Sequence, residues 1–256
     1  MKKLVLLLVL CWTQFVWAGV TTFQKPASPA NPWDSTYDAM IGSSAGSRNY
    51  GGYEFLNLEK ATLRRAIISF PNIDQHTDFD ADDCDSCFLE LKLAFVLEDS
   101  LDLKVAAYLI DSPWTEGVAS GAPWDDTNYV AWNYRNDGTL TANSRTLDTT
   151  WTAGGKFSTV FDTTGIAEVI NVSYQWRVSK TACSTWVVNP SSNYGMLLKY
   201  LNESGGSPHR YWYSSEHATA ANHPKFLVYW TTRSAEPVSV DLTSGLDLGV
   251  GDVGTR

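Results

Sequence analysis

Positive charge is scarce in this sequence. Its 256 residues include 19 lysines and arginines against 28 aspartates and glutamates, which gives a formal net charge of −9 at pH 7. Because a polyanion repels such a chain, nucleic acid and anionic membranes are not expected as partners. Charged residues of both signs make up only 18% of the chain and hydrophobic residues 44%, so the composition excludes a disordered protein and favours a globular one.

Long apolar runs are missing as well. The most apolar stretch, residues 4–10, follows Lys2 and Lys3 and is shorter than the ~20 residues that a membrane-spanning helix needs. Residues 16–18 then end on a small side chain, as a signal peptidase site requires. The sequence therefore predicts a signal peptide over residues 1–18 and a secreted protein that has no membrane anchor after cleavage.

Cysteine is sparse. Beyond the predicted signal peptide the chain contains only Cys84, Cys87 and Cys183. In an oxidising compartment this odd count allows one intramolecular disulfide and leaves one thiol. The spacing of Cys84 and Cys87 is that of a redox pair, but their acidic surroundings disfavour a reactive thiolate. We therefore expect these two residues to form a disulfide that staples a loop.

Several enzyme signatures are absent too. The sequence contains no His-Glu-x-x-His zinc motif and no phosphate-binding glycine loop. His209 and Tyr211 are the candidates for the base and acid that a polysaccharide lyase would need. The expectation is a protein without catalytic activity, and a polysaccharide lyase is the third of three hypotheses.

The chain contains many short segments in which apolar and polar residues alternate. These segments are rich in branched and aromatic side chains. They cover residues 63–70, 88–97, 101–110, 194–201, 211–215 and 226–230. Clusters of Gly, Asn, Ser, Asp and Pro separate these segments, a rhythm that predicts an all-β, antiparallel sandwich. Only residues 164–176 show helix-like spacing, which leaves a short helix or the entry to a strand. Three tryptophans on strand-like segments are assigned to the core: Trp114, Trp186 and Trp230.

The predicted domain organisation is simple. Residues 19–35 form an extended N-terminal segment, and residues 36–232 form the sandwich. Residues 233–256 form a tail that is either flexible or able to donate a strand, because apolar and polar residues alternate cleanly around Val240.

Two copies of Asn-Tyr-Gly, at residues 49–51 and 193–195, each precede a strand-like segment, and we expect glycine to supply a positive φ in both turns. Further short motifs accompany them in chain order: Thr36-Tyr37, Arg64-Arg65-Ala66-Ile67-Ile68-Ser69-Phe70, Trp114-Thr115-Glu116, Asp162-Thr163-Thr164, Tyr213-Ser214-Ser215-Glu216 and His223-Pro224-Lys225-Phe226. The ensemble resembles the DNRLRE-type domain that overlaps carbohydrate-binding module family 96. This resemblance implies a secreted jelly-roll sandwich, in a family whose members bind acidic algal polysaccharides such as alginate.

Aromatic side chains supply the candidate binding site. Sugars stack their C–H faces on aromatic rings while their hydroxyls bond to neighbouring polar groups. Alternation along residues 209–213 places Trp212 and Arg210 on one face and the other three side chains on the opposite face. One of these faces should meet solvent beside the first Asn-Tyr-Gly turn. The predicted carbohydrate-binding residues are Arg48, Tyr50, Tyr53, His209, Arg210, Trp212 and Tyr213.

Aspartates crowd a loop after the segment 63–70. Oxygen ligands at this density suit calcium, which takes six to eight of them in flexible geometry. The predicted metal ligands are Asp78, Asp80, Asp82 and Asp83. The alternative is a solvated acidic loop that binds no cation.

The leading functional hypothesis is a secreted, non-catalytic module or surface protein that binds polysaccharide. The main alternative is a structural subunit of an extracellular filament, appendage or virion fibre. Such a subunit would self-associate by adding a strand to a neighbour's sheet, either from the tail or from residues 19–24.

Overall fold

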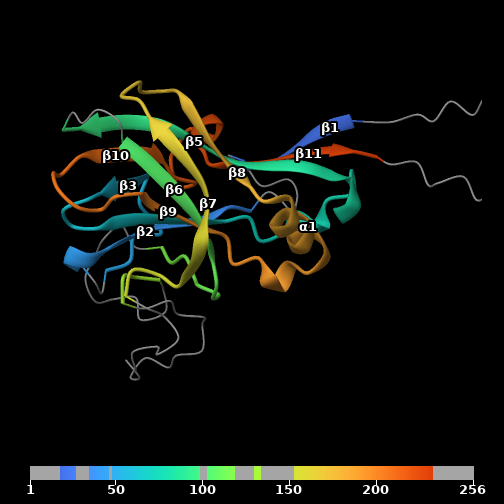
Figure 1. Cartoon of the computed structure of the whole chain (residues 1–256), viewed down its shortest axis with the longest axis horizontal. Coiled ribbons are helices and arrows are strands. Elements are labelled where there is room, and N and C mark those ends of the chain that lie inside the picture. Colours follow the sequence, from blue (N-terminus) through green and yellow to red (C-terminus); the bar gives the residue numbers. More distant parts are fainter. Residues whose placement is uncertain are drawn as a thin grey trace, which may run out of the picture.

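The computed structural model (Figure 1) describes residues 18–26, 35–45, 48–98, 103–118, 130–133 and 153–232. Its strands are β1 (Ala18–Phe23), β2 (Tyr37–Gly42), β3 (Phe55–Glu59), β4 (Arg64–Ser69), β5 (Cys84–Leu97), β6 (Leu103–Ile110), β7 (Phe157–Ile166), β8 (Ser173–Val178), β9 (Met196–Tyr200), β10 (His209–Tyr213) and β11 (Lys225–Thr231). The described ranges also contain the helix α1 (Lys180–Val188) and the 3-10 turns η1 (Ser43–Ala45), η2 (Ile73–Gln75), η3 (Ala81–Asp83), η4 (Pro190–Ser192) and η5 (Ala220–Asn222).

All the strand pairs are antiparallel, and they form two layers. The first layer has the order β3–β10–β5, and the first half of β5 also pairs with β8 and β11, which in turn pairs with β1. The second layer has the order β2–β4–β9–β6–β7. The pair Glu59–Arg64 closes the β3–β4 hairpin that links the layers. The predicted all-β antiparallel sandwich is confirmed, and the jelly-roll topology stays a prediction.

The main core lies between the layers. Leu58 of β3, Leu91 of β5 and Trp212 of β10 pack there against the second layer, to which β4 contributes Ile68. The residue that precedes Ile68 on β4, Ile67, belongs to a second buried cluster on the opposite face of the second layer. Two covered faces explain why Ala66, Ile67 and Ile68 follow one another in this strand with no polar residue between them.

One local prediction was wrong, and one open alternative is decided. Residues 164–176 take the second alternative, the entry to a strand: they comprise the end of β7, a turn and the start of β8. The α-helix of the described residues is instead α1, where the Ser179 side chain caps the N-terminus by accepting from the Ala182 amide at 3.1 Å. Trp186 is buried as expected, but from this helix and not from a strand. The helix has nine residues, too few for a clear 3.6-residue period in the sequence.

The disulfide prediction was also wrong, because Cys87 pairs with Cys183 of α1. Cys84 and Cys87 lie on the same extended strand, where three residues span ~10 Å, and a disulfide requires Cα atoms closer than ~7 Å. Cys84 keeps a free, buried thiol with its Sγ 4.0 Å from that of Cys183. Burial raises the pKa of this thiol, so it is a poor nucleophile.

We expect Cys183→Ser to destabilise the protein by ~4 kcal/mol, because the native bond closes a loop of about a hundred residues. Cys84→Ala removes only the unpaired thiol and should cost ~1 kcal/mol or less. Urea denaturation of both variants measures the difference. Non-reducing peptide mapping that finds a Cys84–Cys87 peptide would contradict the assigned pairing.

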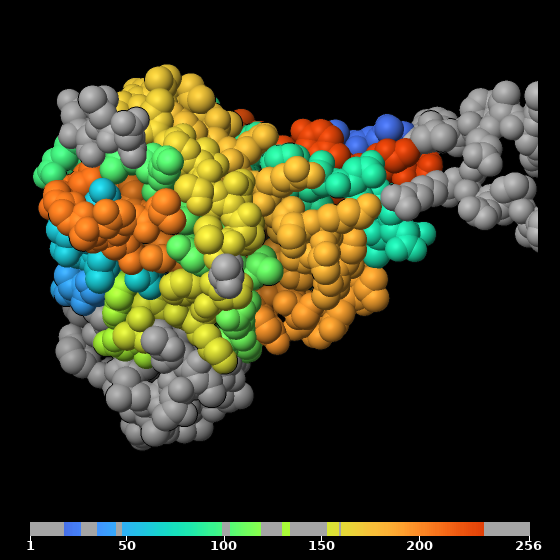
Figure 2. Space-filling view, in the orientation of Figure 1, coloured from blue at the N-terminus to red at the C-terminus, as the bar shows by residue number. Residues whose placement is uncertain are grey.

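The first and last described strands of the chain, β1 and β11, pair with each other. The register runs from Ala18 opposite Thr231 to Phe23 opposite Phe226, and Figure 2 shows the two strands side by side in blue and red. The hypothesis that residues 19–24 complete a neighbour's sheet is therefore replaced by pairing within the chain. The tail and the predicted signal peptide, apart from Ala18, lie outside the described residues. No described helix has the length and apolar character needed to cross a membrane.

Candidate functional site: an aromatic face on the first layer

Strand β10 lies between β3 and β5, and its side chains alternate strictly. Trp212 and Arg210 point into the sandwich and are fully buried, whereas His209, Tyr211 and Tyr213 are only partly buried on the outer face. The period of two predicted this separation correctly.

Aromatic rings from three strands and the adjoining loops meet on that outer face. Phe95 of β5 stacks on Tyr211 with 4.1 Å between ring centroids, and Phe55 of β3 lies 5.2 Å from Phe95 and 5.9 Å from Tyr213. The group continues along the loop before β3, where the Tyr53 ring lies 6.1 Å from Phe55. We call this surface the aromatic face, and its members are Tyr50, Tyr53, Phe55, Phe95, His209, Tyr211, Tyr213 and His217.

One end of the aromatic face is polar. The ring of His209 stacks nearly parallel to Tyr211, and its Nε2 lies 3.7 Å from Glu59 Oε1 while its Nδ1 lies 3.2 Å from Asn57 Nδ2. Arg64 forms an ion pair of 3.1 Å with the other oxygen of Glu59. Burial raises the pKa of Tyr211, an effect that the nearby Arg64 charge opposes. Hydroxyl, imidazole and guanidinium groups therefore border the rings, as sugar recognition requires.

Four of the predicted carbohydrate-binding residues come together on this face: Tyr50, Tyr53, His209 and Tyr213. Arg48 is exposed at the start of the loop that carries Tyr50. Trp212 and Arg210 were assigned wrongly, because both are buried between the layers. Trp212 packs on Trp176 at 5.6 Å, and Arg210 pairs with Glu168 at 3.1 Å.

Four members of the face are absent from the predicted binding residues: Phe55, Phe95, Tyr211 and His217. Tyr211 was considered only as the acid of a lyase. For Phe55 a signal exists, since it alternates with the core residues Leu56 and Leu58 in a short strand. Phe95 and His217 join the face only because β5 and the turn after β10 are placed beside β3 by long-range pairing.

The first Asn-Tyr-Gly turn holds Tyr50 in place. Asn49 donates through Nδ2 to the carbonyl oxygens of Glu116 and Val130, at 2.7 and 2.9 Å, and accepts from the Gly51 amide at 3.2 Å. A Cβ on Gly51 would come within 2.2 Å of the Glu116 carbonyl oxygen. Glycine is therefore needed here for close approach, whereas the expected positive φ occurs only in the second turn, at Gly195.

The acidic loop assembles no ligand set in the described part of the chain, where no three His, Cys, Asp or Glu side chains converge as a metal site. Asp80 and Asp83 form a capping box around η3, and Asp78 lies beside His76 with 3.4 Å between Oδ2 and Nε2. Calcium binding at Asp78, Asp80, Asp82 and Asp83 stays a prediction that this geometry does not support.

A Gly-x-Ser-x-Gly string also occurs, at residues 42–46, with Ser44 in the nucleophile position. A nucleophile elbow needs a strand, a sharp turn and then an α-helix. Here the string follows β2 and passes through η1, and the next described element is β3. The string therefore lacks the context of a serine hydrolase.

Comparison with models of known protein families finds no match, and a search of curated proteins finds no significant relative. Function must therefore be argued from the site itself.

The burial pattern separates two neighbouring aromatic residues of β10. Trp212→Ala should destabilise the protein by ~3 to 5 kcal/mol, because it empties a core position that is fully buried. Tyr213→Ala, on the outer face, should cost ~1 kcal/mol. Thermal unfolding monitored by circular dichroism checks both values, and equal losses would mean that Tyr213 is also a core residue.

Proposed function

We propose that this chain is a secreted, non-catalytic module that binds polysaccharide through the aromatic face. One observation carries the proposal: rings from β3, β5 and β10 gather on the outer face of a sheet, next to a polar group that contains His209 and Arg64. Such a surface offers sugars both apolar stacking and hydrogen bonds. The motif order that resembles the DNRLRE-type domain supports the same class of ligand.

The surroundings of His209 support binding over catalysis. A lyase base needs a ring nitrogen that is free to take a proton from the substrate. Both nitrogens of His209 face protein groups, one toward Asn57 and the other toward Glu59. The ring is thus held as part of the surface, which favours a recognition role.

Assembly by strand addition is the second candidate function, and one observation favours it. Among the described residues, β1 pairs with β11 along one edge and with no strand along the other. An open edge of this kind can accept a strand from another copy. Light scattering on protein at rising concentration tests it: a constant monomer mass removes this candidate, and growth into oligomers favours it.

Affinity electrophoresis in gels that contain xylan, laminarin or alginate tests polysaccharide binding. The unmodified protein should be retarded by at least one of these polymers. Tyr211→Ala and Tyr53→Ala should each raise the dissociation constant about tenfold, which corresponds to ~1.4 kcal/mol. The two rings lie on different elements, so a shared effect would report the face rather than a single strand.

Tyr229→Ala is the matched control. Tyr229 is 37% exposed on β11, outside the aromatic face, where its ring contacts Phe88 at 5.6 Å. This variant should be retarded as strongly as the unmodified protein. Equal losses in all three variants, or retardation that none of them changes, would move the binding site away from the aromatic face.

A further inference from the structure

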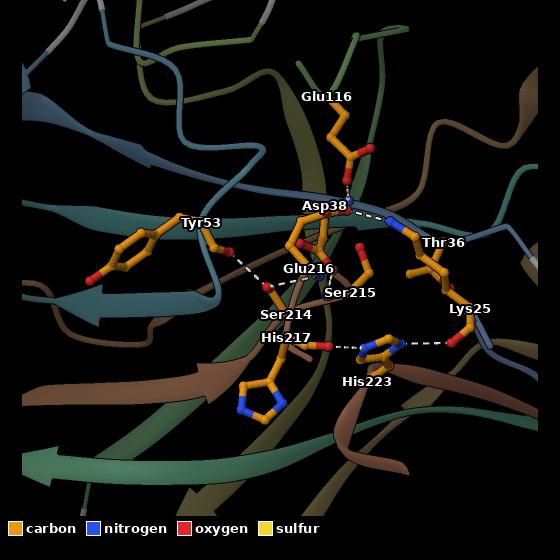
Figure 3. A network of polar contacts seen from close by, with 10 residues as sticks. All are labelled: Lys25, Thr36, Asp38, Tyr53, Glu116, Ser214, Ser215, Glu216, His217 and His223. Atoms are coloured by element: carbon orange, nitrogen blue, oxygen red, sulfur yellow. Dashed lines mark hydrogen bonds and ion pairs between the residues drawn. The ribbon is translucent and has the colours of Figure 1, made fainter. Parts of the chain in front are cut away.

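The turn that follows β10, residues 214–217, is bonded directly to the aromatic face (Figure 3). It continues from Tyr213 and contains His217, whose ring lies 4.5 Å from that of Tyr213. Ser214 Oγ donates to the Tyr53 carbonyl oxygen at 2.7 Å, and the Ser214 amide donates to the Glu54 carbonyl oxygen at 3.1 Å. The conformation of the turn therefore affects the positions of three rings.

The opposite side of the turn is held by a buried carboxyl. The Ser215 amide donates to Asp38 Oδ2 at 2.7 Å, and the Asp38 amide donates to Glu116 Oε1 at 2.6 Å. Asp38 is 1% exposed on β2, and Glu116 lies partly buried on the loop after β6. We call Asp38 and Glu116 the buried carboxyl pair.

Burial disfavours the charged form of both groups. It raises the pKa of Asp38 to about 7, although the hydrogen bond from the Ser215 amide opposes the rise, and the Glu216 charge adds to it. It raises the pKa of Glu116 to about 9, with a further contribution from the Asp38 charge. Lys25 lowers the pKa of both carboxyls but does not cancel the effect of burial.

Two unpartnered atoms point to the same conclusion. The described residues offer no hydrogen-bond partner to Asp38 Oδ1 or Ser215 Oγ, although both atoms are buried. A protonated carboxyl brings an O–H donor to this site, whereas an ionised carboxylate brings only acceptors. Leaving a buried acceptor without a donor is costly, so the lack of a partner for Asp38 Oδ1 adds to the effect of burial against the ionised form.

The remaining ionisable groups around the pair are Lys25, Glu216 and His223. Lys25 and Glu216 form an ion pair with each other at the surface. His223 is buried, with Nδ1 2.6 Å from the Lys25 carbonyl oxygen and Nε2 2.5 Å from the His217 carbonyl oxygen. Both carbonyls accept a hydrogen bond together only when the ring carries two protons. His223 therefore joins residue 217 of the turn to the segment that carries Lys25.

We propose that the buried carboxyl pair couples proton binding to the order of residues 214–217, so that the aromatic face is well ordered at mildly acidic pH and loosens as the pH rises. The effect on sugar binding rests on the proposed function of this face, but the effect on the turn does not. Two carboxyls whose folded pKa exceeds the unfolded value of ~4 stabilise the fold fully below pH ~4, and this stabilisation is lost as the pH rises through 7 and 9.

Hydrogen exchange tests the proposal without any ligand. After correction for the intrinsic pH dependence of exchange, protection of the Ser215 and Tyr213 amides should fall at least about tenfold between pH 6 and pH 9 in the unmodified protein. Asp38→Asn and Glu116→Gln imitate the protonated side chains and keep the oxygen acceptors. Asp38→Asn should hold its protection up to pH 9, whereas Glu116→Gln leaves Asp38 able to ionise and should show a smaller fall than the unmodified protein.

Glu90→Gln serves as the control. Glu90 lies on β5 and forms an ion pair with Lys225 of β11, outside residues 214–217. It should show the same fall in protection as the unmodified protein. Protection that is independent of pH in the unmodified protein, or that falls equally in Asp38→Asn, overturns the proposal. If Asp38→Asn fails to fold, Glu116→Gln decides: a fall in protection as large as in the unmodified protein overturns the role of the pair.

The second experiment measures binding by affinity electrophoresis at pH 6 and pH 9. The gels contain whichever of xylan, laminarin and alginate retards the unmodified protein. Retardation should weaken at pH 9 in the unmodified protein and in Glu90→Gln, and should persist in Asp38→Asn. A pH-dependent turn in a protein that none of the polymers retards would refute the proposed function while leaving the coupling to the turn supported. Retardation that is equally strong at both pH values would overturn the regulation of the aromatic face.

Discussion

The two-residue period of β10 is the constraint on which the site depends. The strand lies in the middle of the first layer, so one set of its side chains must fill the core, and the other set must lie on the outer face. Trp212 and Arg210 fill the interior, and Tyr211 and Tyr213 are left outside. A shift of one residue would bury the tyrosines and expose a tryptophan. Core packing therefore fixes which rings lie on the outer face.

Pairing along β5 determines how many rings gather. Its second half accepts β10 and places Phe95 against Tyr211, while its first half accepts β11 and β8 and holds α1 through the disulfide to Cys183. The segment between β10 and β11 must therefore turn away from the strand direction close to the aromatic face. This turn is held by Tyr53 on one side and Asp38 on the other, which links the face to a strand of the second layer.

The sequence predicted the features that depend on the local period of the side chains. It did not predict the features that depend on pairing between residues far apart in the chain. Tyr53 was grouped with Tyr213 through the first Asn-Tyr-Gly turn, whereas alternation predicted the sandwich class and separated the two sides of β10. It could not show which side faces the core, so Trp212 was assigned to the surface. The partner of Cys87 was missed because a nine-residue helix with a weak period carries Cys183. The pairing of Asp38 with Glu116 joins residues 78 positions apart, and no local pattern indicates such a contact.

Burial has different consequences for two pairs of ionisable groups. Arg210 and Glu168 carry opposite charges, so the buried guanidinium is compensated and its pairing requires no change in protonation. Asp38 and Glu116 carry charges of the same sign, and burial makes their full ionisation unfavourable. Arg210 is buried between the layers and Glu168 is partly exposed, whereas the second pair lies beside the turn that adjoins the aromatic face. The proposed sensitivity to pH therefore lies next to the aromatic face and not within the main core.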